Sequence, residues 1–244
     1  MDRRNFVLKT AAGASLAMMA PSFAFGLGKG QDKIRIGFIG VGARGTGQLG
    51  LTLQRKDILV TAVSDIDQER LANAAKMVQD AGMKKPATFG AGPYDYQKLL
   101  QREDVDAVII STPWLWHTPM AIDAMEAKKA VGLEVAGAFD IQECWALVDA
   151  YEKTGTPFMI LENVAYRRDV MAVLNMVRQN LFGEIIHLQG GYQHDLRHVK
   201  FNNGQQLYGG GVEFGEKGYS EARWRTNHSV NRNGDIYPTH GLGP

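Results

Sequence analysis

Cysteine is almost absent from this sequence, which holds one, Cys144, in 244 residues. A single cysteine excludes an intrachain disulfide, and its position beside Trp145 in a helical pattern predicts a small core residue rather than a nucleophile. A single cysteine also excludes a C-x-x-C pair, the spacing typical of zinc-binding cysteines. We therefore expect no metal site.

An excess of charge of one sign is also lacking, because 27 Lys and Arg stand against 26 Asp and Glu, a formal net charge of +1. This balance gives no electrostatic argument for a nucleic acid or an anionic membrane as partner. The hydrophobic content of 45% is ordinary for a globular protein, and the length fits one large domain or two small ones. These numbers leave open whether the protein forms a homo-oligomer.

No apolar run reaches the ~20 residues that span a bilayer. The candidate at the N-terminus, from Ala11 to Ala20, follows the pair Arg3 and Arg4 and precedes small residues suited to cleavage. Residues 1–30 resemble a twin-arginine signal peptide and linker, and a membrane anchor is the second interpretation. We expect a periplasmic or secreted protein that uses the twin-arginine export machinery and keeps no stable membrane span in its mature form. This route carries folded proteins, which suits a chain that loads a cofactor before export.

A glycine motif follows the first apolar strand, which is predicted over 34–39. Gly40, Gly42 and Gly45 form G-x-G-x-x-G, a helical stretch runs to about Leu53, and a second strand ends in Asp65. Gly40 permits the tight turn, Gly42 lets the backbone approach a pyrophosphate, and Gly45 lets the helix pack on the strand. The helix N-terminus offers N–H groups to phosphates.

Asp65 decides which nucleotide this motif predicts. Its carboxylate suits the two hydroxyls of a ribose and would repel a 2′-phosphate, so we expect NAD rather than NADP. The alternative is a βαβ unit without a ligand.

Strands and helices alternate over residues 31–165, which predicts an α/β Rossmann domain with a doubly wound parallel sheet. Ligands gather at the carboxyl ends of such strands. This places one group of residues around a single crevice: Ala43, Arg44, Asp65, residues 111–117, Glu134 and Asn163.

The aromatic residues after the strand near 107–110 have two interpretations. Trp114 and Trp116 could wall a nicotinamide or a sugar, or fill the gap between strand and helix, and we expect the second for one of them. Glu134 ends a strand, where an unpaired carboxylate is costly to bury. It is expected to meet a ribose, a hydroxyl or a backbone N–H, and Asn163 to hold the nicotinamide amide or its ribose.

Residues 166–244 are expected to start an α+β substrate domain with an antiparallel sheet, truncated in this chain. A helix with Val170, Val173, Leu174 and Val177 on one face stops at Gly183, and "EIIHLQGGY" is predicted as the first strand. Residues 202–218 are expected to form a loop. Because too few strands remain to close a sheet, we expect this chain alone to be poorly folded after about residue 165 and to be an inactive fragment.

Several of these motifs together resemble the glucose–fructose oxidoreductase and inositol dehydrogenase family (Gfo/Idh/MocA). They are the glycine loop, S-T-P-x-x-x-H, a Glu at the end of the next strand, and E-N after the sixth strand, over roughly residues 33–244. The family usually has E-K-P where this chain has Glu134, Val135 and Ala136. The lysine normally assists proton transfer from the substrate hydroxyl, so its absence puts a plain dehydrogenase in doubt.

A narrower resemblance is to glycoside hydrolase family 109, carried by "WLWH", "EVAGA", "ENVAYRRD", "RWRT" and "YPTHGLGP". It implies an NAD-dependent enzyme with α-N-acetylgalactosaminidase activity. The implied NAD contacts are Ala43, Arg44, Asp65, Trp114, Leu115, Trp116, His117, Glu134, Val135 and Asn163. The implied substrate contacts are Tyr192, Arg225, Tyr237, Pro238, Thr239 and His240, and Tyr237 is placed near the cofactor as well.

The implied reaction oxidises the sugar at C3, eliminates the C1 leaving group after loss of the C2 proton, adds water and returns the hydride. His240 and Tyr237 are the acid–base candidates, since an imidazole titrates near working pH and a nearby cation lowers the pKa of a phenol. The residue pattern alone also allows Tyr192 in a sheet, Arg225 paired with Glu221, and a structural His240. The competing functions are an NAD-dependent sugar or cyclitol dehydrogenase and a cofactor-binding protein without turnover.

Overall fold

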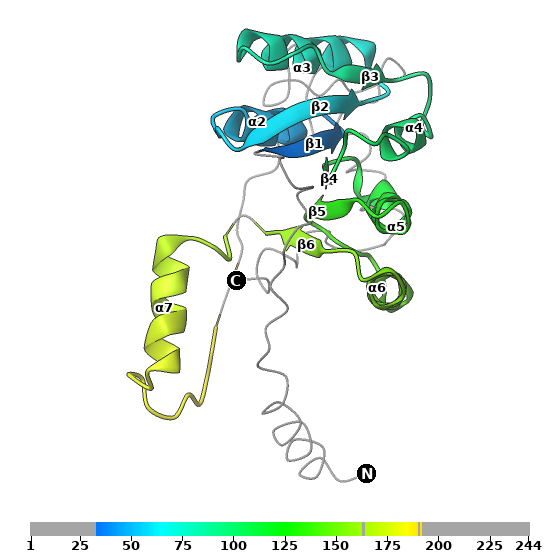
Figure 1. The fold of residues 1–244 in the computed structure, drawn as a ribbon. Helices are drawn as coiled ribbons and strands as arrows, with labels where there is room; N and C mark the ends of the chain where they lie inside the picture. The colour runs from blue at the N-terminus through cyan, green and yellow to red at the C-terminus, as the bar shows by residue number, and fades with distance from the viewer. Residues whose placement is uncertain (1–32, 163, 190, 192–244) are drawn as a thin grey trace, which may run out of the picture.

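The computed structural model of the protein describes residues 33–162, 164–189 and 191. Its centre is a six-stranded parallel sheet in the order β3-β2-β1-β4-β5-β6 (Figure 1). The strands are β1 (Ile34–Ile39), β2 (Ile58–Ser64), β3 (Ala87–Phe89), β4 (Ala107–Ile110), β5 (Ala130–Glu134) and β6 (Phe158–Leu161). The order reverses between β1 and β4, which is the doubly wound arrangement predicted from the alternating pattern.

Helices cover both faces of the sheet. They are α2 (Ala43–Thr52), α3 (Gln68–Asp80), α4 (Tyr96–Leu100), the 3-10 helix η1 (Trp114–Trp116), α5 (His117–Glu126) and α6 (Ile141–Thr154). One hydrophobic core lies between the sheet and α4, α5 and α6, and the other lies between the sheet and α2 and α3. Phe38 and Ile39 are adjacent in β1 and belong to different cores, because successive strand residues point to opposite faces.

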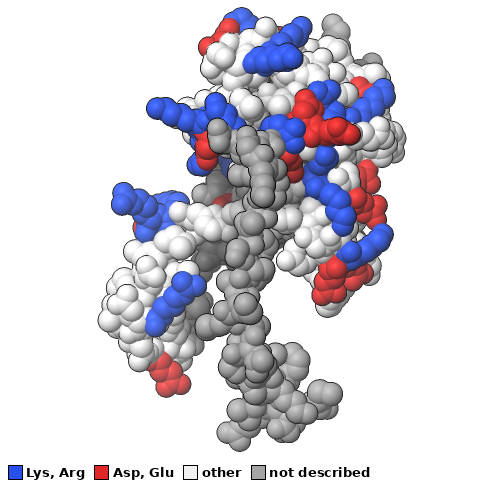
Figure 2. All heavy atoms as spheres, viewed as in Figure 1, with Lys and Arg blue, Asp and Glu red and all other residues white. Residues whose placement is uncertain are grey.

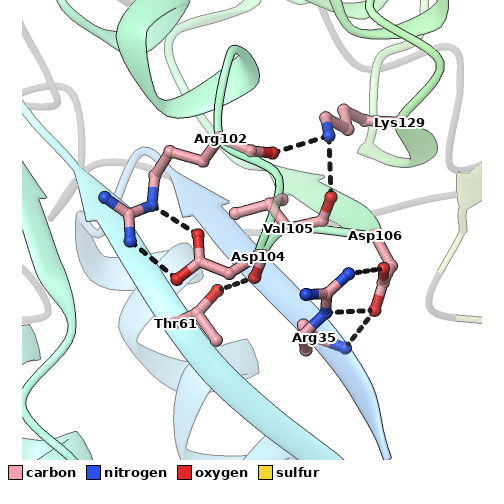
Figure 3. Close-up of polar contacts among 7 residues, drawn as sticks. All are labelled: Arg35, Thr61, Arg102, Asp104, Val105, Asp106 and Lys129. Carbon is pink, nitrogen blue, oxygen red and sulfur yellow. Dashed lines mark hydrogen bonds and ion pairs between the residues drawn. The ribbon is translucent and has the colours of Figure 1, made fainter. Parts of the chain in front are cut away.

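Charged groups fix the amino end of the sheet (Figure 3). The guanidinium of Arg35 donates to both carboxylate oxygens of Asp106, at 3.0 and 2.6 Å. The ammonium of Lys129 donates to the carbonyl oxygens of Arg102 and Val105. These contacts join β1 to the segments that lead into β4 and β5, at the amino edge of the sheet. Ligands bind in such folds at the opposite edge, outside the carboxyl ends of the strands.

The exposed face of α6 corrects the expectation for Cys144. Its thiol is exposed rather than in the core. Leu147 and Ala150 are the buried residues of α6, whereas Ile141 and Trp145 are both more than 60% exposed. The apolar residues of α6 spread over a wider face of the helix than the sheet covers. Cys144 is therefore exposed even though its neighbour Trp145 is apolar.

Helix α7 (Arg168–Arg178) forms where a helix was predicted, and it stands away from the sheet (Figure 1). It buries none of its residues, and Val173, Leu174 and Val177 on its predicted apolar face are exposed. The predicted strand after Gly183 is wrong over residues 184–189, which form no strand. A strand needs a hydrogen-bonding partner, and none of the described residues pairs with this segment.

The surface matches the balanced composition. Lys and Arg are interspersed with Asp and Glu over the face in Figure 2. Among the described residues, no helix combines the length and the apolar character that crossing a membrane requires.

Candidate functional site

The glycine turn between β1 and α2 leaves no room for side chains. Gly40 has a φ of +84°, and a Cβ there would lie 2.8 Å from backbone atoms of Ser111 and Thr112. A Cβ on Gly45 would lie 2.0 Å from the carbonyl oxygen of Gly40. The two glycines therefore allow the turn and the close packing of α2 on β1, as their spacing predicted. Gly40 also lets the segment after β4 approach closely, which was not predicted.

Helix α2 begins directly after this turn with its N-terminal end free of side-chain caps. Gly42 is the N-cap residue, no side-chain cap hydrogen bond is made there among the described residues, and the first turn holds no acidic residue. Ala43 and Arg44 are its first two residues. An uncapped N-terminus beside a glycine turn suits an anionic phosphate, because its N–H groups and dipole favour negative charge.

Asp65 follows β2 at the same edge of the sheet. Its Oδ2 accepts from the Val41 N–H at 2.7 Å, and its Oδ1 accepts from the Asp67 N–H at 3.0 Å. Burial raises the pKa of Asp65, even though both backbone hydrogen bonds act in the opposite direction. Each carboxylate oxygen can accept a further hydrogen bond, so the residue fits the ribose hydroxyls of a dinucleotide.

Glu134 ends β5 and belongs to a network of four residues near the point where the strand order reverses. Its Oε2 lies 3.0 Å from the Nε of Arg44 and also accepts a hydrogen bond from Nε2 of Gln48. Ser111, just after β4, donates its hydroxyl to Oε1 of Gln48. Arg44 and Glu134 were expected at this crevice, whereas Gln48 was missed and Ser111 was given no role. The available signal was helical spacing, because Gln48 follows Arg44 by four residues and so lies on the same face of α2.

The aromatic segment after β4 is divided between the core and the surface. Trp114 is 6% exposed and its ring lies 6.0 Å from that of Phe139, so it fills the space beside the sheet, as was expected of one tryptophan. Trp116 meets Tyr94 edge to face at 5.4 Å, and Leu115 is 62% exposed. Leu115 is therefore accessible at the carboxyl edge, whereas Trp116 is partly buried against the core beneath α4, α5 and α6.

His117 is buried beside the site, with 1% of its surface exposed. Its Nδ1 lies 2.7 Å from the carbonyl oxygen of Ala136, and its Nε2 lies 2.8 Å from that of Thr112. Burial lowers the pKa of His117 to about 4, although the carbonyl contacts favour the protonated ring. Both ring nitrogens face backbone carbonyl oxygens, and the neutral ring donates to one of the two. The imidazole therefore packs between the loops after β4 and β5, with neither nitrogen directed toward a cofactor. Val135, beside it, is 5% exposed.

The other candidates lie outside the described residues. They are Asn163, Tyr192, Arg225, Tyr237, Pro238, Thr239 and His240. Within residues 33–162, 164–189 and 191, no group of three or more His, Cys, Asp or Glu side chains could hold a metal ion.

Two family models match the chain. The model described as "Oxidoreductase family, NAD-binding Rossmann fold" matches residues 34–161, and the one described as "Glycosyl hydrolase 109, C-terminal domain" matches residues 166–244. Both resemblances drawn from the sequence motifs are confirmed, and NAD is the cofactor of this Rossmann fold. The glycine turn, the uncapped α2 and Asp65 fit that dinucleotide.

Named relatives match nearly the whole chain. A glycosyl hydrolase family 109 protein of Stenotrophomonas maltophilia (strain K279a) is 50% identical over 248 residues, covering 100% of this chain and 54% of the relative. An alpha-N-acetylgalactosaminidase of Tannerella forsythia is 45% identical over 263 residues, covering 99% and 56%. The chain thus spans about half the length of these relatives.

Solved structures share the fold. Scyllo-inositol dehydrogenase from Lactobacillus casei with bound NAD(H) and scyllo-inositol has a TM-score of 0.56 at 21% identity, covering 63% of this chain and 43% of that one. Myo-inositol 2-dehydrogenase from Lactobacillus plantarum has a TM-score of 0.56 at 22% identity, covering 65% and 44%. The chain therefore belongs to the NAD-binding Rossmann-fold oxidoreductase family (Gfo/Idh/MocA), and its residues 166–244 match the C-terminal domain of glycosyl hydrolase 109.

Proposed function

We propose that the protein is an NAD-dependent glycoside hydrolase that acts on terminal α-N-acetylgalactosamine or a related glycoside. The observation that carries this proposal is the presence, in one chain, of an NAD-binding Rossmann domain and a match to the glycosyl hydrolase 109 C-terminal domain. The 45% identity to a protein named alpha-N-acetylgalactosaminidase supports the choice of sugar.

The described residues supply the cofactor half of such a site. Asp65 would hold a ribose, the turn from Gly40 to Gly45 and the start of α2 would hold the phosphates, and Glu134 would hold the second ribose. Bound NAD supplies a reversible hydride acceptor, so that a sugar oxidised at C3 can lose its C2 proton and its C1 substituent and then be reduced again. Tyr237 and His240 remain our candidates for the proton transfers.

The environment beyond Glu134 differs from that usual in the wider family. Val135 and Ala136 are 5% and 3% exposed and carry no group that moves a proton, in the place of the lysine that usually follows the glutamate. Oxidation of the C3 hydroxyl therefore needs another base, a role for which Tyr237 and His240 are our candidates. The fold neighbours named as dehydrogenases keep that function as the second candidate.

The deciding assay uses a version of the protein extended to the length of its relatives, with the Tannerella relative beside it. A nitrophenyl α-N-acetylgalactosaminide is added without external NAD, and nitrophenol and NADH absorbance are followed together. We expect nitrophenol without net NADH, because the hydride returns to the sugar. Net NADH from free sugar and added NAD⁺, with no nitrophenol, would identify a dehydrogenase instead.

We further propose export by the twin-arginine route to the periplasm or the exterior. The support is the sequence alone, with Arg3 and Arg4 before an apolar stretch. Replacing both arginines by lysine (R3K/R4K) should leave the protein inside the cell, as measured by fractionation and immunoblot of a bacterial host. The matched change K9R should leave export intact. Equal export of R3K/R4K and the parent would contradict this route.

A further inference from the structure

Only one of the two carboxylate oxygens of Glu134 contacts other described side chains. The side chain is 10% exposed, and its Oε2 forms an ion pair with the Nε of Arg44 and accepts a hydrogen bond from the Nε2 of Gln48. Within the part of the chain that the structure describes, Oε1 has no hydrogen-bond partner. One oxygen is therefore fixed by protein donors and the other can accept a hydroxyl from outside.

Gln48 is itself held in one orientation. Its Oε1 accepts the hydroxyl of Ser111, and its Nε2 donates to Glu134. A carboxylate can only accept, so the NH₂ group of Gln48 faces Glu134, and the amide oxygen is left to accept the hydroxyl of Ser111. Ser111 is fixed in turn, because its N–H donates to the carbonyl oxygen of Ile39 at 2.8 Å. The chain Ser111–Gln48–Glu134 thus joins β4, α2 and β5.

Arg44 is expected to lose its contact with Glu134 when a cofactor binds, whereas Gln48 is expected to keep its contact. Its side chain is 45% exposed, and it lies in the first turn of α2, at the end that attracts phosphates. A bound pyrophosphate would compete with Glu134 for its guanidinium. Gln48 is neutral and one turn further along the helix, so its bond to Glu134 does not face this competition.

We propose that Gln48 is a positioning residue that, with Ser111, orients Glu134 so that its free oxygen accepts a ribose hydroxyl of NAD. This role rests on the proposed cofactor site and deepens it. The glutamine is neither a catalytic group nor a direct ligand in this account. It acts on the cofactor through Glu134.

The test measures the Kd for NAD⁺ of the protein, extended to the length of its relatives, by calorimetry at about pH 8, with the melting temperature of each variant. Q48L and Q48E should weaken binding roughly tenfold, because a hydrogen bond to a charged group is lost, and S111A should weaken it about threefold. Q54L is the matched control, since Gln54 is exposed just after α2 and should leave the Kd unchanged.

A pH series separates positioning from a merely structural role. In Q48E two carboxyl groups lie in contact, and one of them takes up a proton more readily than an isolated acid. The protonated group can donate again, so the Kd of Q48E relative to the parent should recover between about pH 8 and pH 5.5, whereas Q48L should not recover. The titratable groups that face this pair are the guanidinium of Arg44 and the imidazole of His117, and burial lowers the pKa of His117 to about 4.

The outcomes are distinguishable. Parent-like Kd values for Q48L and Q48E, whatever their melting temperatures, would overturn the role of Gln48 and leave the cofactor site standing. Absence of NAD⁺ binding by the parent protein would overturn the proposed function and, with it, this role. If Q48L does not fold, the isosteric Q48E and its pH profile decide.

Discussion

Asp65 is held in an environment that works against its charge. Burial raises its pKa, and two backbone N–H groups, from Val41 and Asp67, offset this only in part. A ribose that donates hydroxyls to the carboxylate would favour the ionised form. Binding of NAD and ionisation of Asp65 are therefore linked.

We predict that NAD⁺ affinity falls at acid pH, starting above the ordinary aspartate pKa of about 4. The sign follows from the raised pKa, since a protonated Asp65 loses an acceptor for the ribose. D65N should bind NAD⁺ roughly tenfold more weakly at neutral pH and show a flatter profile. Calorimetric titration of both proteins between about pH 5 and pH 8 checks this.

The same variant tests the nucleotide preference. D65N removes the charge that would repel a 2′-phosphate, so the ratio of NADP⁺ to NAD⁺ affinity should rise. E69Q, in the exposed first turn of α3, serves as the charge-matched control and should change neither ratio nor profile. An unchanged ratio in D65N would mean that Asp65 does not face the adenosine ribose.

The sequence motif predicted the roles of the glycines and of the aspartate in the site. It did not predict the roles of the amide of Gln48 and the hydroxyl of Ser111. Gly40, Gly45 and Asp65 belong to a motif in which each residue type answers a backbone or charge requirement. Gln48 and Ser111 act only because α2, β4 and β5 meet at one point. Their roles depend on contacts between residues 63 and 86 positions apart, which no local pattern encodes.

At the scale of elements, the sheet is fixed at its amino end by the pair of Arg35 and Asp106. Burial alone would raise the pKa of Asp106, but the hydrogen bonds from the Arg35 side chain and backbone hold it below its ordinary value. The contribution to stability is therefore present above the unfolded pKa of about 4 and is lost as pH falls through the lower folded value.

We predict that R35A lowers the free energy of unfolding by about 1–2 kcal/mol at pH 7, since the pair is bidentate and about three-quarters buried. The difference from the parent should shrink below about pH 4, as seen in urea unfolding at several pH values. R55A is the control, because Arg55 and Asp57 form an exposed pair and no loss is expected. A loss in R35A that is equal at pH 7 and pH 3 would contradict the ionic origin.

The elements of the Rossmann domain followed from the sequence because local pattern and tertiary demand agree there. Buried apolar runs such as β4 have a neighbour on each side, and α2 and α3 each have one apolar face to bury. The segment after Gly183 has the same apolar pattern without a partner strand among the described residues, so it stays unpaired. Pattern predicts a strand only where a sheet is available to receive it.

At the scale of the whole molecule, one chain combines a dehydrogenase fold with a match to a hydrolase domain. The fold alone cannot choose between the two chemistries, because a family of this kind hosts more than one reaction. The match of residues 166–244 to the glycosyl hydrolase 109 C-terminal domain favours net hydrolysis with the hydride returned. The proposed reaction therefore passes through an oxidised intermediate that is not released as product.

Exchange of the C2 hydrogen with solvent distinguishes this intermediate from direct displacement at C1. The protein, extended to the length of its relatives, is incubated with a nitrophenyl α-N-acetylgalactosaminide in D₂O, and any released sugar is examined by NMR and mass spectrometry. Elimination removes the C2 proton and water addition replaces it from solvent, so we predict one deuterium at C2 and no net NADH. A released sugar without deuterium at C2 would show direct displacement at C1 and would contradict the account.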